Sequence, residues 1–319
     1  MNQSHEGSLG YQMMKALQGI FHPGAKRHQA KRDHRNVELI TSISTMRCMS
    51  ADVHQFARFI RSNWPEVKHL SEVKPQMAHD YIEELVERER SGGRIGRVCA
   101  SIRKLDVACR KAGIFPQDVP LLLPNRDQGG LGGFHSKPKP IPYTEEQAQA
   151  IITWIAVEDA TIGTLLTLMW AGGLRVTEAT WLRAQDIHLE NGTITLNQEG
   201  NVNRTKGGRP RIVHYSPGYQ DFMSGLLNLG INQPTGHLFT DRRGLPDQAR
   251  KLVRKACREL GIPGLATHAF RKTFSVEDYH RARSAGVSDQ QALLETSLQL
   301  GHNRVDVTRQ SYIPRGERE

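Results

Sequence analysis

The chain lacks the features that mark several common classes of protein. Its four cysteines, Cys48, Cys99, Cys109 and Cys257, are scattered, so no Cys-x-x-Cys pair offers the ligand spacing of a zinc site. No extracellular context requires disulfides, and we expect buried thiols in a reducing cytoplasm. No apolar run is long enough to cross a bilayer, and the N-terminus lacks an apolar segment followed by a cleavage site. The sequence therefore predicts a soluble protein without membrane contact that stays in its own compartment.

Motifs for nucleotide and metal binding are also missing. No glycine-rich run ends in Gly-Lys-Ser or Gly-Lys-Thr, so we do not expect ATP as an energy source. No His-Glu-x-x-His, clustered carboxylates or His/Cys ligand pairs appear, which weakens metal-dependent hydrolysis without excluding a dispersed acidic site. We expect no cofactor and no metal site. Cations and hydroxyl groups remain as the candidates for chemistry.

Charge and length indicate the partner and the number of domains. Lys and Arg outnumber Asp and Glu by 43 to 33, which gives a net charge of +10 and a pI near 9.6. This balance favours a polyanion, with nucleic acid ahead of an anionic membrane surface. The chain has 319 residues, 38% of them hydrophobic, which is enough for folded cores and too long for one average core. We expect two domains.

The first part of the chain divides into an extension and a helical bundle. Residues 1–35 end in a cluster of Lys, Arg and His, which makes them either a nucleic-acid-contacting arm or a solvated tail. Residues 36–112 contain apolar residues at helical spacing, as in Val53, Phe56, Ala57 and Ile60. We expect a helix from about residue 51 to Trp64-Pro65, a second that ends at Ser91-Gly92-Gly93, and a third after it.

The third predicted helix is basic, and the segment after it reads as a linker. The helix presents cations with no interleaved acid on its exposed side, which favours phosphate contacts over plain solubility: Arg94, Arg97, Arg103, Lys104, Arg110 and Lys111. Residues 113–142 are rich in proline and glycine and continue no periodicity. Lys137 and Lys139 alternate with prolines at the end of this linker, as suits a stiff cationic strap along DNA.

Residues 143–319 predict a mainly helical second domain with a small antiparallel β-sheet. Thr144 with Gln147 forms a capping box that starts a helix through Ile155, and a very apolar helix over 165–170 stops at Gly172-Gly173. Alternating apolar residues flank Asn191-Gly192, a strong hairpin signal, and a third strand over 212–215 follows the turn at 205–208. The fold class is therefore mainly α with an inserted sheet (α+β).

Three motifs in this domain occur in a set order. They are Ala171-Gly172-Gly173-Leu174-Arg175-Val176-Thr177-Glu178, then Thr267-His268-Ala269-Phe270-Arg271, then Leu300-Gly301-His302 with Tyr312 downstream. A His-x-x-Arg pair occurs a second time at His280 and Arg283, so each motif alone is weak. In their order and joint presence they resemble the boxes of the tyrosine recombinase (phage integrase) family. The resemblance covers about 143–315, and the preceding bundle looks like the family's core-binding DNA-binding domain.

The resemblance implies phosphoryl transfer on DNA with Tyr312 as the nucleophile. A tyrosine can store the phosphodiester energy in a covalent intermediate for rejoining. A five-coordinate phosphorane carries more negative charge than the diester, so the paired donors of Arg175 and Arg271 would bind it better than the ground state. Glu178, one turn after Arg175, is either an orienting partner or a structural ion pair.

Further roles follow from the same resemblance and from the chemistry of the side chains. Lys206 in the turn would protonate the departing 5′-oxygen; otherwise it is an ordinary turn lysine. His268 would act as an acid, a base or a hydrogen-bond donor on a helix that Thr267 can cap, and His302 would donate to a phosphate oxygen. The neighbouring arginines read as contacts to the DNA backbone: Arg204, Arg209 and Arg211.

The function expected from the resemblance is site-specific recombination that integrates, excises or resolves a mobile genetic element. We expect a homotetramer on two sites of double-stranded DNA, in the cytoplasm with the nucleoid, with accessory DNA-bending or directionality proteins as further partners. Two alternatives are a type IB-like topoisomerase and a non-catalytic DNA-binding accessory protein. The sequence departs from the family in a long interval between Arg271 and His302, with an extra stretch over 275–296, and in a short tail after Tyr312.

Overall fold

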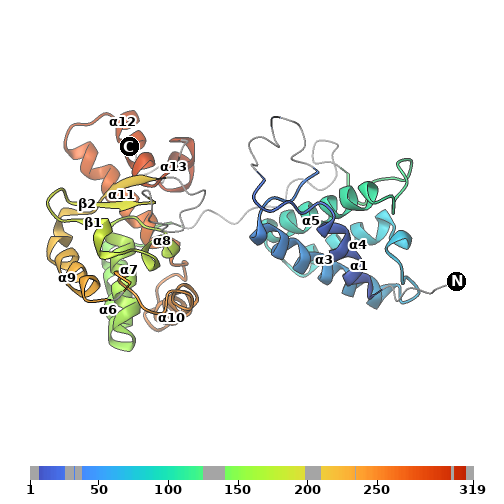
Figure 1. Ribbon diagram of the computed structural model, residues 1–319, viewed down its shortest axis with the longest axis horizontal. Helices are drawn as coiled ribbons and strands as arrows, with labels where there is room; N and C mark the ends of the chain where they lie inside the picture. Colours follow the sequence, from blue (N-terminus) through green and yellow to red (C-terminus); the bar gives the residue numbers. More distant parts are fainter. Residues whose placement is uncertain are drawn as a thin grey trace. The chain divides into compact units, whose positions relative to one another are not determined.

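The computed structural model of the chain describes residues 7–25, 32, 38–124, 141–197, 210–233, 235–302 and 305–313. The chain divides into two compact units, Met1–Pro138 and Lys139–Glu319, and Figure 1 labels most of their helices and strands. The predicted fold class is confirmed, since the described residues are mostly helical and contain one small antiparallel sheet.

The first unit is a helical bundle around one apolar core. Its helices are α1 (Leu9–Gln18), α3 (Ile43–Asn63), α4 (Pro75–Glu87) and α5 (Gly92–Lys111), with a 3-10 turn at Leu70–Glu72. Helix α1 packs against α3 and α5, and α5 also packs against α3 and α4. Apolar side chains from all four helices form the core.

The prediction that residues 1–35 form an extension outside the bundle is wrong for Leu9–Gln18. Met13 and Leu17 of α1 are fully buried, and Ile20 just after it is 1% exposed. The spacing of Met13 and Leu17 places both on one helix face, which lies against α3. The prediction for the whole segment rested on the cationic cluster after residue 25, whereas the residues before that cluster have apolar side chains at helical spacing. Residues 26–31 and 33–37 lie outside the described residues.

Two helix boundaries in the bundle also differ from the prediction. Helix α3 begins at Ile43 rather than near residue 51, and it ends just before Trp64 as predicted. Gly92 and Gly93 open α5 instead of ending α4, because the Ser91 hydroxyl accepts a hydrogen bond from the backbone N–H of Arg94 and caps the new helix.

The first part of the predicted linker belongs to the bundle. Phe115, Leu122 and Leu123 are buried in its core. Arg110 fixes this segment, because its guanidinium binds Asp106 at 2.8 Å and donates to backbone carbonyls between Pro116 and Pro120. Arg110 is therefore a structural clamp and not part of an exposed basic face. Residues 125–140 lie outside the described residues.

The second unit surrounds a buried helix with further helices and the sheet. In chain order its helices are α6 (Glu145–Glu158), α7 (Ala160–Ala171), α8 (Val176–Thr180), α9 (Gln220–Ile231), α10 (Leu245–Glu259), α11 (His268–Ser284), α12 (Asp289–Gln299) and α13 (Val305–Ser311). Helix α7 contacts α6, α8, α10 and α11. The stretch over 275–296 forms the rest of α11, a turn and most of α12, which gives the longer interval after Arg271 a helical structure.

The predicted hairpin and third strand are confirmed. Strands β1 (Ile187–His188), β2 (Thr193–Leu196) and β3 (Arg211–His214) form an antiparallel sheet in that order, with short 3-10 turns at Ala184–Asp186 and Pro217–Tyr219. Gly192 turns the hairpin with φ +63°, which only glycine adopts freely. Ile194 pairs with Val213, and Leu196 pairs with Arg211.

The predicted start and end signals of the first two helices in this unit are also present. Thr144 and Gln147 form the capping box of α6. Helix α7 ends at Ala171, and Gly173 follows with φ +57°. A side chain at Gly173 would overlap the ring of Phe274 on α11, so a glycine is needed both for the turn and for this close approach.

The four thiols are free and differ in exposure. Cys48 on α3 is exposed, whereas Cys99, Cys109 and Cys257 are buried. Burial raises the pKa of Cys99, and burial followed by the charge of Asp106 raises the pKa of Cys109 to about 12. Among the helices that the described residues form, none is long and apolar enough to span a membrane.

Candidate active site

The second unit brings together the predicted site residues that the structure describes. Arg175 precedes α8, His268 and Arg271 lie one turn apart on α11, His302 follows α12, and Tyr312 follows α13. Lys206, the sixth, lies outside the described residues. Side chains from four helix ends and one helix interior therefore meet in one region.

Glu178 is the acceptor that the arginines of this region share. Its side chain is fully buried on α8. Oε1 accepts from Nη1 of Arg175 at 2.6 Å, and Oε2 accepts from the backbone N–H of Arg175 at 2.9 Å. Arg271 lies 3.7 Å away, and Arg211 donates to both oxygens. One carboxylate thus orders three guanidiniums, and the local charge stays positive and suited to an anion.

The same contacts set the ionisation of Glu178. Burial alone would raise its pKa, but the hydrogen bond and charge of Arg211, then the charges of Arg271 and Arg175, outweigh burial and lower the pKa to about 2. Glu178 is therefore ionised at neutral pH. It forms buried ion pairs and also orients the guanidinium of Arg175, so the two roles considered from the sequence do not exclude each other.

Arg271 is completely buried. Its Nη1 and Nη2 donate to the carbonyls of Gly173 and Leu300, and its Nε has no hydrogen-bond partner among the described residues. Burial and the nearby charge of Arg175 lower its pKa to about 10, which leaves it protonated at neutral pH. The guanidinium is thus held rigidly between the turn before Arg175 and the turn before His302.

Tyr312 lies between the two histidines. Its hydroxyl is 2.7 Å from Nε2 of His268, and its ring centroid is 4.6 Å from that of His302. Nδ1 of His302 is 3.0 Å from the hydroxyl of Thr308 on α13, which fixes the imidazole ring. In the tautomer that carries its proton on Nδ1, His268 accepts the hydrogen bond from the phenol.

Both histidines are neutral at pH 7. Enclosure among its neighbours, then the charges of Arg271 and Lys272, lowers the pKa of His268 to about 4. Burial, then the charges of Arg271 and Arg175, lowers the pKa of His302 to about 3. A neutral imidazole beside a phenol can take up its proton.

The predicted cap of α11 is wrong in its detail. Thr267 stands at the N-cap position, but its backbone is in the helical region and its side chain makes no capping hydrogen bond. Thr273 further along the helix donates to the carbonyl of Tyr143, which ties α11 to the start of the unit. The helix is held by packing of its buried phenylalanines rather than by its cap.

The low pKa values predict a stability that falls in acid in two steps. His302 has a pKa of about 3 in the folded chain against an ordinary 6.5, so its contribution is complete above pH 6.5 and is lost as the pH falls towards 3. Glu178, at about 2 against 4.5, loses its contribution below pH 4.5. Thermal melting of the full chain from pH 7.5 to 4.5 should show the first step, and His302→Gln should reduce it. An equal slope in both proteins would contradict this.

Residues 143–315 match the Phage integrase family. The chain belongs to this family of tyrosine recombinases. The tyrosine recombinase XerC of Pelobacter propionicus is 24% identical over 291 residues, which cover 88% of each chain. XerC of Mesorhizobium japonicum is 26% identical over 259 residues, 73% of this chain and 76% of that protein. The Tn1549 transposon integrase, solved in complex with transposon right end DNA, shares the fold with a TM-score of 0.58 at 17% identity, over 96% of this chain and 95% of the other.

The cations predicted to contact DNA in this tyrosine recombinase are partly engaged within the protein. Arg94 and Arg97 both bind the buried Asp52, at 2.7 and 3.3 Å, and Arg103 donates to the carbonyl of Pro124. The side chain of Arg97 is still 49% exposed. Lys104 is half-buried on α5, the helix that also carries Arg94, Arg97 and Arg103. Four others lie outside the described residues: Lys137, Lys139, Arg204 and Arg209.

Arg211, which the sequence predicts as a backbone contact to DNA, is engaged within the second unit. Its side chain is only 10% exposed, and its guanidinium is bound to Glu178 and to the carbonyl of Gln299. It points into the unit because Arg211 and Val213 alternate with the exposed Ile212 along β3. The predicted strand began one residue too late to reveal this alternation.

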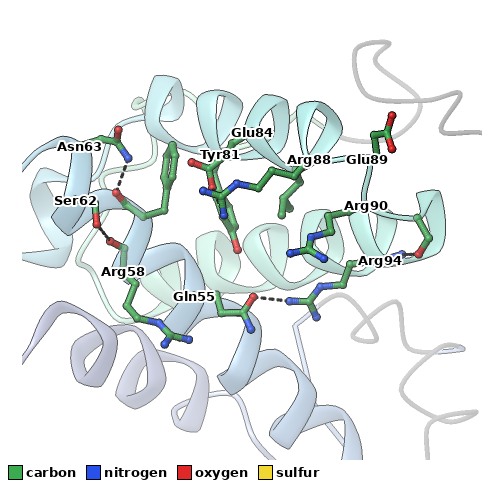
Figure 2. A pocket seen from close by; sticks show the side chains of 13 residues that line it. Gln55, Arg58, Ser62, Asn63, Tyr81, Glu84, Arg88, Glu89, Arg90 and Arg94 are labelled. Carbon is green, nitrogen blue, oxygen red and sulfur yellow. Dashed lines mark hydrogen bonds and ion pairs between the residues drawn. The ribbon is translucent and has the colours of Figure 1, made fainter.

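The recombinase has a basic hollow in its helical unit that the sequence interpretation missed in part. The hollow measures about 750 Å³ and lies between α3, the end of α4 and the start of α5. Figure 2 shows Arg88, Arg90 and Arg94 on one side and Arg58 on the other, with Tyr81 between them. Arg88 is paired with Glu84, but within the described part of the chain no acid pairs with Arg58 or Arg90. Only Arg94 could be found from the basic helix; the others come from different elements.

Among the residues that the structure describes, no three His, Cys, Asp or Glu side chains are grouped as ligands for a metal ion. The polar groups of the site are guanidiniums, imidazoles, a phenol and the carboxylate of Glu178.

Proposed function

We propose that this recombinase cleaves and rejoins duplex DNA at specific sites through a 3′-phosphotyrosyl intermediate on Tyr312. The observation that carries the proposal is the 2.7 Å contact between the Tyr312 hydroxyl and Nε2 of a neutral His268, beside two guanidiniums held by Glu178. A nucleophile, a proton acceptor and anion-stabilising donors are thereby adjacent.

In the cleavage step, the Tyr312 oxygen attacks the scissile phosphorus and its proton passes to Nε2 of His268. The bond from phosphorus to the 5′-oxygen breaks, and that oxygen leaves as a hydroxyl after it takes a proton. Arg175 and Arg271 stabilise the additional negative charge of the phosphorane. Rejoining is the reverse attack by a 5′-hydroxyl, so the phosphodiester energy is kept.

Two further roles complete the proposal. Lys206 gives the proton to the departing 5′-oxygen, because an ammonium is a suitable acid for an alkoxide. His302 packs on the Tyr312 ring, with Nδ1 near Thr308, and this leaves its Nε2 to donate to a non-bridging phosphate oxygen. Since His302 is neutral, this donation requires the proton on Nε2, with Nδ1 accepting from the hydroxyl of Thr308.

The biological reaction we propose is the integration, excision or resolution of a mobile genetic element by a homotetramer on two DNA sites. Accessory DNA-bending or directionality proteins are proposed partners. A topoisomerase would cleave one duplex without pairing sites, and a binding-only protein would form no covalent bond, so the products of the reaction distinguish the three.

The test is incubation of the full chain with the DNA ends that neighbour its gene, either intact, so that joined products can form, or with a nick next to the cleavage site, so that the covalent intermediate is trapped. We expect a covalent protein-DNA adduct and joined products in EDTA and without ATP, because guanidiniums and a protein nucleophile supply the chemistry. Strict dependence on magnesium would contradict the proposal. Relaxation of a supercoiled plasmid that carries these ends, without joined sites, would favour the topoisomerase.

The basic hollow predicts how DNA affinity depends on salt. If Arg58 and Arg90 each neutralise a phosphate, Arg58→Gln and Arg90→Gln should each weaken binding to all sequences and reduce the salt slope by about 1. Arg250→Gln is the control, because Arg250 is already paired with Asp247 on α10. Filter binding between low and physiological salt measures the slope. Unchanged slopes in both hollow variants would remove the hollow from the DNA interface.

A further inference from the structure

Arg211 joins parts of the active site that come from distant points of the chain. Its Nη1 and Nη2 donate to Oε1 and Oε2 of Glu178 at 3.1 and 2.7 Å, and its Nε donates to the carbonyl of Gln299 at 3.1 Å. Strand β3, helix α8 and the end of α12 therefore meet on one guanidinium. The planar fork reaches all three acceptors at once, which a point charge cannot do.

The contacts continue from these acceptors to the proposed catalytic residues. Glu178 accepts from Arg175 and lies 3.7 Å from Arg271. The carbonyl of Leu300, next to that of Gln299, accepts from Arg271. The last carbonyls of a helix have no partner within it and carry partial negative charge, so they accept well from guanidiniums. The end of α12 thus binds both Arg211 and Arg271.

His302 follows this turn directly. Gly301 has φ +63°, and a Cβ there would lie 3.0 Å from Cδ of Arg211, so the arginine stem packs against the backbone just before His302. Further along the strand, the backbone N–H of His214 donates to Oε1 of the same Gln299 at 2.8 Å. Strand β3 therefore holds the turn before His302 by side-chain and backbone contacts together.

We propose that Arg211 is a positioning residue of the cleavage reaction. Its fork fixes Glu178 relative to the last turn of α12, and this aligns the arginine pair and His302 before DNA binds. The inference rests on the proposed function, because it assigns a task within that cleavage site. It replaces the contact to the DNA backbone that the sequence predicts for Arg211.

The two assignments make opposite predictions for Arg211→Lys and Arg211→Gln in the full chain. For a positioning residue, the affinity and its salt slope stay as in the wild type, while single-turnover cleavage at saturating DNA slows by about tenfold to a hundredfold, since a misplacement of about 1 Å has this effect. For a phosphate contact, affinity falls, the salt slope drops by about 1, and cleavage at saturation is normal. The second outcome would overturn the proposal.

A matched control separates positioning from loss of stability. Arg110 is a clamp of the same kind in the helical unit, where it binds Asp106 and backbone carbonyls. We expect Arg110→Lys to lower the melting temperature at least as much as Arg211→Lys but to leave cleavage by the folded protein unchanged. Equal slowing of cleavage in both variants would reduce Arg211 to a structural contact.

The lysine variant also shows whether Arg211 acts through its positive charge alone or through the planar geometry of its guanidinium. If Arg211→Lys cleaves as fast as the wild type, positive charge alone is sufficient and the fork has no positioning role. Should Arg211→Gln not fold, Arg211→Lys keeps the charge and carries the test. Wild-type protein that forms no adduct would defeat the proposed function itself, whereas normal wild-type cleavage with unaffected Arg211 variants would defeat only this inference.

Discussion

Replacing Tyr312 with phenylalanine is expected to abolish the covalent protein-DNA adduct while DNA binding is retained. Tyr312 is only 7% exposed, and the centroid of its ring lies 4.6 Å from that of His302 and 5.8 Å from Nζ of Lys272. Phenylalanine keeps this packing and loses only the nucleophilic oxygen. Denaturing gels of the nicked substrate measure the adduct, and mobility shifts measure binding.

A suitable control is Tyr219→Phe, because Tyr219 is a partly buried tyrosine against Trp170 and Phe222 in the same unit. It should form the adduct at the wild-type level. Adduct formation by Tyr312→Phe would mean that another side chain attacks, and the assignment of the nucleophile would be lost.

Glu178→Gln is expected to destabilise the chain by about 3–5 kcal/mol, the range found when one partner of a buried ion pair is removed. The carboxylate is fully buried and contacts Arg175 and Arg211, with Arg271 at 3.7 Å. An amide of the same shape removes the negative charge that, among the described residues, lies between these guanidiniums, and it forces its nitrogen against their N–H groups. Chemical denaturation of the full chain measures the loss.

Glu158→Gln provides the comparison in the same unit. Glu158 pairs with Lys255 at 2.8 Å, but its side chain is 42% exposed, and such pairs contribute at most about 1 kcal/mol. A loss for Glu178→Gln no larger than that for Glu158→Gln would show that the buried carboxylate does not hold the arginines together.

Local signals in the sequence were sufficient for several elements. The capping box at Thr144, the glycines after α7 and the Asn191-Gly192 hairpin act through neighbours within a few residues, so the sequence itself contains their cause. The order of the three motifs was sufficient to bring Arg175, Arg271 and Tyr312 into one hypothesis, although none of them is near another in sequence.

Other features depend on contacts that no local pattern contains. Helix α1 is stabilised by burying Met13 and Leu17 against α3, and the segment after α5 by the contacts of Arg110. Asp52, which binds Arg94 and Arg97, lies on a different helix from them. The sequence of α5 alone therefore contains no acid for Arg94 and Arg97, because their partner Asp52 lies on α3.

The surroundings of Arg211 could be predicted from the sequence only in part. Alternation along β3 places Arg211 and Val213 on one face, and an arginine on an inward face requires a buried anion or carbonyls. Glu178 was already a candidate in the preceding motif. What the sequence could not supply is the carbonyl of Gln299, which reaches the arginine only through the packing of α12 on β3.

The uneven burial of the four thiols means that a thiol reagent can label the wild-type chain selectively at one cysteine. Cys48 is exposed on α3, whereas Cys99, Cys109 and Cys257 are buried, and the raised pKa of Cys99 and of Cys109 keeps these two as thiols rather than thiolates at neutral pH. A maleimide dye should therefore attach to the helical unit at one position, with no substitution needed. Such a dye would report on the approach of DNA to that unit independently of cleavage.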